Sequence, residues 1–324
     1  LAQHDWEVIL VHVGPIRDAL TERLTRAVHA EVTLNGTLAA DAARLRELAA
    51  DIIIYPELGM DRCVLALAAL PLAPRQVCAW GHPVTTGLPT IDVFLSCTEM
   101  EPADASQHYS ERLITLPGLG TRYSGPPVPA AVSRRQLGLP EERALYLVPQ
   151  ALFKLHPDND CVLVDIVRRD PDALFVLFEL RSPSPIRRVR ERLLRALAQV
   201  SAQPQRHLHW FAECTREDYL RINLACDVMV DSLHWSGGNA SLDALHAGLL
   251  VVTCPGRYMR GRQTMAMLRR TDCAELVAES PQQLAALAVE IAHDHERRNK
   301  LAGRLSANLS ALHHSDEPPL ALDA

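Results

Sequence analysis

The stretch "DVMVDSLHWSGGNASLDAL", residues 227–245, shows how this chain is built. "DVMVD" is a short apolar, β-branched run typical of a buried strand, Gly237 and Gly238 close a turn out of it, and a helical pattern follows. The first N–H groups of a helix have no partner within it, and together with the helix dipole they favour an anion. The stretch therefore predicts a strand, a turn and a helix N-terminus suited to a phosphate. An ordinary N-cap at Asn239 or Ser241 explains the same residues without a ligand.

Asp243 lies one turn into this predicted helix. Its carboxylate is placed where it could accept hydrogen bonds from the hydroxyls of a ribose. The alternative is an ordinary first-turn acid that complements the helix dipole. A glycine-rich turn is a weak signal by itself, so both interpretations stay open on spacing alone.

The same rhythm of strand and helix runs along the whole chain. Short apolar runs alternate with helical patterns of 10–15 residues, which is typical of a parallel α/β fold. Helical patterns include residues 39–49 and 61–70, and the chain is helical from about residue 281. The predicted strands are 7–13, 31–34, 51–55, 76–80, 92–96 and 112–116 in the first half, and 144–149, 174–179, 207–211, 227–231, 250–254 and 274–277 in the second.

A stretch rich in glycine and proline, around residues 117–140, separates the two halves. We therefore predict two Rossmann-like, doubly wound domains facing across a cleft, with the ligand at the carboxyl ends of the strands. In such a sheet the first and fourth strands are neighbours. The predicted divisions are a first domain at 1–120, a linker at 121–140, a second domain at 141–300, and a C-terminal helix and tail at 301–324.

The bulk composition excludes several classes of protein. A net charge of −6 argues against a nucleic-acid partner, and no apolar run reaches the roughly 20 residues that span a bilayer. The eight cysteines include no C-x-x-C pair. We therefore expect free thiols, no metal site, no membrane association and a cytoplasmic location.

Lysine is rare in this chain, and one of its two positions is informative. Of 33 basic residues only Lys154 and Lys300 are lysines. Lys154, in "VPQALFKLHP" (148–157), follows the predicted strand 144–149, next to the predicted fourth strand. A compact ammonium on a flexible stem suits phosphate oxygens in a tight site. A surface lysine, like Lys300 on a polar helix, is the alternative.

Other polar residues follow strands as well. The loop "WGHPVTTG", residues 80–87, places His82, Thr85 and Thr86 at a strand end, and Arg260 and Arg262 open a later helix as phosphate partners or surface charges. A structural role is the alternative for His82. The D-x-D triplet in "HPDND" is interpreted as a helix start rather than a metal site. A structural role is also assigned to His156, His207, His209, His293, His295, His313 and His314, since none shows ligand spacing.

Seven segments, in order, resemble a known family. The match covers about residues 50–300 and is to the catalytic region of O-linked N-acetylglucosamine transferases of the SPINDLY type, in their bacterial form. The chain is also similar to bacterial cytoplasmic N-glycosyltransferases. The segments are "DIIIYPELGMD", "LAPRQVCAWGHPVTTG", "IDVFLSCTEMEP", "QHYSERLITLPG", "QALFKLHP", "DSLHWSGGNASLDALHAGLLVVT" and "PGRYMRGRQTMAML".

The resemblance implies a GT-B fold and an inverting transfer of N-acetylglucosamine from UDP-GlcNAc to Ser/Thr hydroxyls of a protein, with no required metal or cofactor. The acceptor suggested by bacterial relatives is flagellin or another surface protein. The resemblance also implies roles for individual residues. On the donor side, Lys154 would contact the nucleotide diphosphate with Gln150 nearby, the phosphates would be held by Gly237, Gly238, Asn239 and Ala240, the ribose by Asp243, and the uracil by Cys214, Arg216 and Tyr219, with Arg262 also on this side. The sugar and acceptor side would be lined by His82, Thr85 and Thr86, and His82 is the candidate base.

The chain departs from the family pattern at several points. The turn reads "SGGNAS" where members have "NGGTTT" or "NGHTTG", and Ala151 stands where many have glutamine. Leu1 lies near the family's second strand, so we expect that the first strand and the tetratricopeptide repeats are not in these residues. Two other functions remain open: a non-catalytic nucleotide-sugar-binding or scaffold module, and a UDP-sugar epimerase of the same fold.

Overall fold

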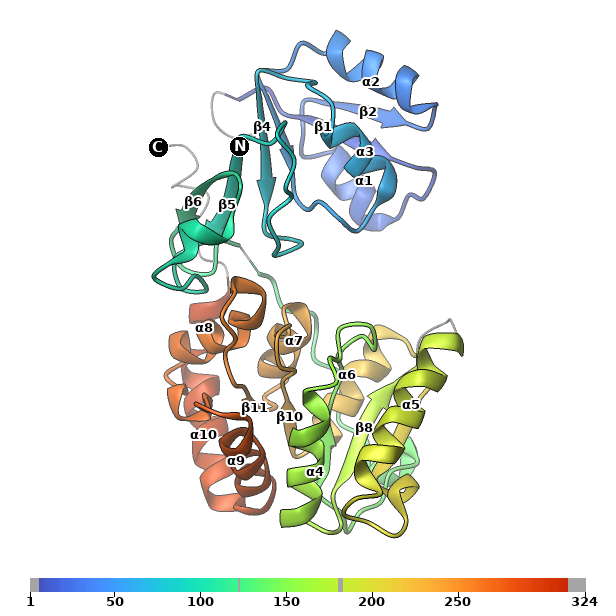
Figure 1. Ribbon diagram of the computed structural model, residues 1–324, viewed down its shortest axis with the longest axis vertical. Coiled ribbons are helices and arrows are strands. Elements are labelled where there is room, and N and C mark those ends of the chain that lie inside the picture. The colour runs from blue at the N-terminus through green and yellow to red at the C-terminus, as the bar shows by residue number, and fades with distance from the viewer. Residues whose placement is uncertain (1–5, 122, 180–182, 314–324) are drawn as a thin grey trace. The chain divides into compact units, whose positions relative to one another are not determined.

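The structure is a computed structural model that describes residues 6–121, 123–179 and 183–313. It forms two compact units, one ending at Gly120 and the other beginning at Thr121. Both units are built from parallel strands connected by helices (Figure 1). The α/β architecture predicted from the alternating pattern is therefore confirmed.

The first unit contains two parallel sheets. One pairs β1 with β2, and the other has the order β3-β4-β5-β6, which is also the chain order. Val32 of β2, Leu45 of α2 and Leu67 of α3 are buried in one core cluster, and Ile53 of β3 packs against it. The elements are β1 (Ile9–Val13), α1 (Ala19–Thr25), β2 (Ala30–Leu34), α2 (Leu38–Glu47), β3 (Ile52–Tyr55), α3 (Arg62–Ala68), β4 (Arg75–Ala79), β5 (Val93–Cys97), the 3₁₀-helix η1 (Ala105–His108) and β6 (Arg112–Leu116).

The second unit has one five-stranded parallel sheet with the order β11-β10-β7-β8-β9. Its first strand β7 and fourth strand β10 are neighbours, as predicted. Its strands are β7 (Leu145–Leu147), β8 (Leu174–Phe178), β9 (Leu208–Phe211), β10 (Val228–Val230) and β11 (Val251–Val252). Its helices are η2 (Arg134–Leu137), α4 (Asn159–Arg169), α5 (Pro183–Leu197), η3 (Pro204–His207), α6 (Arg216–Ala225), α7 (Asn239–His246), η4 (Met259–Gly261), α8 (Gln263–Arg270), η5 (Ala274–Leu276), α9 (Pro281–His293), α10 (His295–Asn308) and η6 (Leu309–Leu312).

One predicted strand is wrong. In the predicted range 274–277, Ala274–Leu276 form the 3₁₀-helix η5, and Val277, directly after it, makes a single bridge to Thr253. The N–H groups of Leu276 and Val277 bond to the carbonyls of Cys273 and Ala274, both at 3.0 Å. Because these donors are used locally, they are not available for a ladder, and the apolar pattern of a short run does not distinguish the two conformations.

Three of the five strands of the second unit, β7, β10 and β11, are buried along their whole length, whereas the edge strand β9 is half-buried. All three residues of β7 and of β10 are buried, because helices cover both faces of the sheet. The α9 helix, for example, packs against β10 and α4 (Figure 1). Burial of each such side chain contributes roughly 1.5–3 kcal/mol. This core fixes the positions of the loops at either end of the strands.

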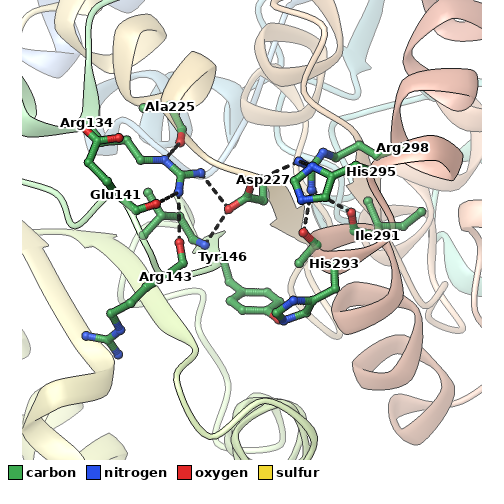
Figure 2. A network of polar contacts seen from close by, with 12 residues as sticks. Arg134, Glu141, Arg143, Tyr146, Ala225, Asp227, Ile291, His293, His295 and Arg298 are labelled. Carbon is green, nitrogen blue, oxygen red and sulfur yellow. Dashed lines mark hydrogen bonds and ion pairs between the residues drawn. The ribbon is translucent and has the colours of Figure 1, made fainter.

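A polar network closes the amino end of the same sheet (Figure 2). Asp227, directly before β10, accepts from Arg134 at 2.7 Å and from the N–H of Leu145 at 2.8 Å, and Arg298 of α10 lies 3.4 Å from it. Arg134 also donates to the carbonyl of Ala225. The network thus anchors η2 and α10 on the edge of the sheet opposite to the carboxyl ends of the strands.

Two further expectations concern membranes and thiols. No helix in the described ranges is long and apolar enough to cross a membrane. All eight cysteines are free thiols, as predicted. Burial raises the pKa of Cys78 and of Cys97 to about 12, so both stay protonated and unreactive at neutral pH.

Candidate functional site

The loops after β7 and β10 are held together by Gln150. Its side-chain amide donates to the hydroxyl of Ser232 at 3.0 Å and to the carbonyl of Trp235 at 2.9 Å. Both donor hydrogens are therefore engaged within the protein. Gln150, predicted to lie near the ligand, joins the two loops and so sets the position of Trp235.

Lys154 lies over the side chain of Trp235. Its Nζ atom is 4.7 Å from the centre of the indole ring and 5.8 Å from that of Phe153, within range of cation–π attraction. Burial lowers the pKa of this half-buried lysine. Within the described part of the chain no carboxylate forms an ion pair with it. The ammonium is thus partly desolvated and available to an anion.

Arg260 approaches the same indole. Its Cζ atom lies 5.9 Å from the ring of Trp235 and 4.8 Å from that of Tyr258, and its carbonyl accepts the N–H of Ser236 at 2.7 Å. No acidic side chain of the described ranges pairs with this guanidinium either. Two cations therefore converge on one indole without a neutralising carboxylate, which favours a bound anion.

The N-terminus of α7 directly follows this loop. Gly238 is its N-cap residue, and its carbonyl accepts the N–H groups of Ser241 and Leu242, both at 3.1 Å. The N–H groups of Asn239 and Ala240 have no hydrogen-bond partner in the part of the chain that the structure describes. The turn therefore presents open donors at the positive end of a helix dipole, as expected for phosphate binding.

A buried carboxylate determines the shape of this turn. Asp231, 3% exposed, accepts from the hydroxyls of Ser236 at 2.6 Å and Thr253 at 2.7 Å and from the N–H of Gly237 at 2.8 Å. Burial raises the pKa of Asp231, and these donors compensate in part for the lost solvation. These three hydrogen bonds fix the end of β10 and the start of the turn.

Both glycines of the turn are required by close packing. A Cβ atom at Gly237 would lie 2.3 Å from the hydroxyl of Ser241, and one at Gly238 would lie 2.7 Å from the side-chain oxygen of Gln263. Neither glycine has a positive φ, so the constraint is space rather than backbone conformation. The space at Gly237 is limited by Ser241 of α7, and the space at Gly238 by Gln263 of α8.

A second cluster surrounds Asp243, further along α7. Its carboxylate accepts from the hydroxyl of Tyr123 at 2.6 Å and from Arg216 at 2.7 Å. Tyr219, on the same helix as Arg216, packs on Phe178 with ring centres 5.4 Å apart, and no hydrogen-bond partner of its buried hydroxyl lies in the described ranges. Because each helical residue rises 1.5 Å, Asp243 lies ~6 Å along the axis from Asn239.

The predicted donor-side residues therefore divide into two groups in the second unit. Arg216, Tyr219 and Asp243 come together, and Lys154 lies beside the loop that leads into Gly237. Cys214 is half-buried just before α6, whose N-cap is Thr215. Arg262 contacts the carbonyl of Gly256 at 3.4 Å at the start of α8.

The residues predicted for the sugar and acceptor side lie in the first unit. The hydroxyl of Thr85 and the N–H of Thr86 each donate to Glu111 at 2.7 Å, and the hydroxyl of Thr86 donates to the same carboxylate. Burial acts to raise the pKa of Glu111, but the bonds from both threonines outweigh it and hold that pKa below its usual value. The threonines thus fix their own loop. His82 is half-buried, with its ring against Gly59.

Sequence reasoning missed three residues of the second unit. Trp235 lies within the opening stretch, and its large side chain between two polar segments was a usable signal. Asp231 follows a buried strand, and this position was a weaker signal. Tyr123 gives no local signal at all, because it reaches Asp243 across 120 positions of the chain.

Comparison with known proteins decides the family. Residues 120–314 match the sequence model of Glycosyl transferase family 41, which covers most of the second half of the chain. The chain belongs to glycosyl transferase family 41. The resemblance inferred from the seven segments is confirmed.

Curated relatives of this family member are similar over most of its length. A probable UDP-N-acetylglucosamine–peptide N-acetylglucosaminyltransferase SPINDLY of Oryza sativa subsp. japonica is 26% identical over 329 residues, 94% of this chain and 34% of the relative. A UDP-glucose:protein N-beta-glucosyltransferase of Actinobacillus pleuropneumoniae serotype 5b is 26% identical over 279 residues, 84% and 43% of the two chains. The chain spans about a third of the SPINDLY relatives it matches.

Solved structures confirm the GT-B fold with two Rossmann-like domains. A mutant O-GlcNAc transferase of Thermobaculum terrenum superposes with a TM-score of 0.81 at 26% identity, over 98% of this chain and 60% of that one. WaaG, a glycosyltransferase involved in lipopolysaccharide biosynthesis, gives a TM-score of 0.58 at 15% identity, over 98% of this chain and 99% of that one. The second likeness concerns the fold alone.

Proposed function

We propose that this chain is the catalytic region of an inverting protein glycosyltransferase that moves N-acetylglucosamine from UDP-GlcNAc to Ser/Thr hydroxyls. One observation carries the proposal: the unpaired cations Lys154 and Arg260 converge on Trp235 beside the open N–H groups of α7. This arrangement supplies positive charge and directed donors at one place, which is what a diphosphate requires. The names of the relatives support the choice of sugar and of a protein acceptor.

The reaction follows from where charge develops. The acceptor oxygen attacks the anomeric carbon, the bond from that carbon to the β-phosphate oxygen breaks, and the configuration inverts. The leaving UDP gains negative charge, which Lys154 and the N–H groups of Asn239 and Ala240 stabilise. Such fixed donors lower the barrier because they need no reorganisation as the bond breaks. The attacking hydroxyl gives its proton to a base, for which His82 remains the candidate.

The nucleoside half of the donor belongs to the Asp243 cluster in this proposal. Asp243 accepts from the ribose hydroxyls, exchanging or sharing its present donors Tyr123 and Arg216. Tyr219 and Cys214 flank the uracil in this arrangement. The ~6 Å between the two ends of the site along α7 suits a ribose joined to a diphosphate.

A lysine fits position 154 better than an arginine. The ammonium rests on the face of Trp235 and presents three donors that can rotate among the oxygens of a diphosphate. A guanidinium is planar and wider, and Arg260 already occupies space near the same ring. We therefore expect Lys154→Arg to be a poor substitute despite the conserved charge.

Calorimetric titration with UDP tests this site. Lys154→Ala should weaken UDP binding at least about tenfold, as expected for loss of a charge-assisted contact worth roughly 1.5–3 kcal/mol, and Lys154→Arg should restore little of it. Lys300→Ala, at the other lysine, on the exposed face of α10, is the matched control and should bind like the wild type. Equal UDP affinity in Lys154→Ala and wild type, with both folded by circular dichroism, would remove Lys154 from the site.

Transfer itself needs a second assay. Radiolabelled UDP-GlcNAc incubated with Ser/Thr-containing peptides should give labelled peptide, and Lys154→Ala should reduce the rate by on the order of 10²–10³. A labelled sugar nucleotide that isomerises without an acceptor would show an epimerase instead. UDP binding without label on any peptide would favour a binding module.

A further inference from the structure

Three side chains with metal-binding atoms meet at the edge of the second unit. His156 and Asp158 lie on the segment that leads into α4, and His234 lies on the loop after β10. We propose that this His156–Asp158–His234 cluster binds a divalent transition-metal ion, with Zn²⁺ as the best-fitting one. No step of the proposed sugar transfer uses the ion, so the inference is independent of that function.

The distances suit a common ion. The Nε2 atom of His234 is 2.7 Å from Asp158 Oδ2, and the Nδ1 atom of His156 is 3.4 Å from the same oxygen. One ligand atom from each of the three side chains lies within 4.8 Å of the others. Ligands on a tetrahedral Zn²⁺, at about 2.0–2.1 Å from the ion, are ~3.3 Å apart. All three side chains are exposed, so small rotations complete the geometry.

The donor set selects the kind of ion. Two imidazoles and one carboxylate are a typical three-residue Zn²⁺ set, which leaves a fourth position for water. Mg²⁺ and Ca²⁺ prefer oxygen ligands alone, and imidazole suits Zn²⁺ and its neighbours in the transition series. Asp158 and His234 also line a cavity of about 500 Å³, which gives water access to the open position.

The surrounding contacts hold the ligands near one another. Asn159, next to Asp158, accepts the N–H of Leu233 at 2.8 Å and so joins the start of α4 to the residue before His234. The rings of His156 and His234 pack edge to face with centres 4.9 Å apart. His234 also has a φ of +68°, an unusual conformation for a residue other than glycine. The cluster is therefore assembled before an ion arrives.

An ion in the cluster would connect two loops of the second unit. His156 follows β7 by sequence and His234 follows β10, and these strands are neighbours in the sheet. Trp235 and Lys154 lie on the same two loops, one and two residues from a ligand. Bound metal should therefore raise the melting temperature by mass action.

Titration of the metal-free chain with Zn²⁺, without nucleotide, tests the proposal. The wild type should bind one ion with micromolar or tighter affinity, and Co²⁺ should give the intense visible absorption of a tetrahedral site. The variants His156→Ala, Asp158→Asn and His234→Asn should each weaken binding at least about tenfold, as loss of a ligand costs no less than loss of a supporting contact. Asparagine is chosen at 234 because it tolerates positive φ.

His293→Ala is the matched control. His293, which is exposed, contacts the buried Asp170 at 3.0 Å in the second unit, and no second histidine of the described residues joins them in a metal-binding group. This variant should bind Zn²⁺ like the wild type. The proposal is overturned if wild-type affinity is only millimolar, or if binding persists unchanged in the three cluster variants. Neither result bears on UDP binding, which is measured separately.

Discussion

At the residue scale, the environment of Lys154 destabilises its charged form, and a bound anion would relieve that penalty. Burial against Trp235 removes water from the ammonium, which lowers its pKa, and no carboxylate in the described ranges offsets the cost. The charge of a bound anion would compensate the ammonium for the hydration it loses on burial. This environment supports the proposed phosphate contact of Lys154, whereas Lys300 lies on an exposed helix surface.

This lowered pKa predicts how UDP affinity depends on pH. In the free chain Lys154 loses its proton below the ordinary value of 10.5, so UDP affinity should decline as pH rises through that lowered pKa. The uracil ring also deprotonates at alkaline pH, and the decline of UDP affinity in the Lys154→Ala variant measures that contribution separately. Calorimetry from pH 7 upward should show a steeper decline in the wild type than in the variant. Parallel curves would mean that Lys154 does not contact the ligand.

The contribution of Lys154 to the stability of the fold changes with pH in the opposite direction. The charged form is penalised in the folded state, so the contribution of Lys154 to the free energy of unfolding increases as pH rises from its lowered pKa toward 10.5. Loss of UDP affinity in that window therefore does not reflect loss of the fold at this residue.

At the element scale, the β10–α7 turn is closely packed and held by buried hydrogen bonds. Asp231 fixes one side of it through buried hydrogen bonds, and α8 packs behind it through Gln263 and Thr264. The open N–H groups of α7 can face a ligand only while this turn keeps its shape. The turn that is proposed to bind the diphosphate is thus held in shape by the residues packed behind it.

Gly237→Ala tests that rigidity. The new Cβ atom would meet the buried Ser241 at 2.3 Å, so we expect the free energy of unfolding to fall by about 1–3 kcal/mol, and UDP affinity to fall as well. Gly303→Ala in α10 is the control, because a Cβ atom there meets nothing within 4 Å, and it should stabilise by roughly 0.5–1 kcal/mol. Urea unfolding measures both. An unchanged stability in Gly237→Ala would contradict the packing described here.

At the scale of the whole molecule, a stabilising polar network and the candidate nucleotide site lie at opposite ends of the sheet in the second unit. The polar network around Asp227 closes the amino end of the sheet (Figure 2), and the candidate nucleotide site lies at the carboxyl ends of β7 and β10. A three-residue strand such as β10 rises about 10 Å, which separates the two ends. Substitutions at Asp227 should therefore affect folding and leave the ligand site intact.

Asp227→Ala should lower the free energy of unfolding by about 3 kcal/mol, because it leaves the largely buried Arg134 without its partner. Asp165→Ala removes an ion pair with the more exposed Arg168 and should cost no more than about 1 kcal/mol. Chemical denaturation gives both values, and UDP titration of the folded variants should match the wild type. A large loss of UDP affinity in folded Asp227→Ala would show that the two ends are coupled.

Much of the fold was accessible from the sequence alone. Alternating apolar runs and helical patterns predicted the parallel sheets, and the order of strands made β7 and β10 neighbours. The glycine-rich turn and the start of α7 at Asn239 also follow the prediction. These features depend on short-range patterns, since a strand or a helix N-terminus is encoded within about ten residues.

Only the tertiary structure decided which side chains meet. Tyr123 reaches Asp243 across 120 positions and His234 reaches Asp158 across 76. The bond from Gln150 to the carbonyl of Trp235, which joins two loops, likewise appears only in the folded chain. The strand predicted at 274–277 became η5 because local hydrogen bonds competed successfully for its N–H groups. Sequence patterns specify each element, but the partner of a polar group depends on which elements packing brings together, and that is settled only when the whole chain folds.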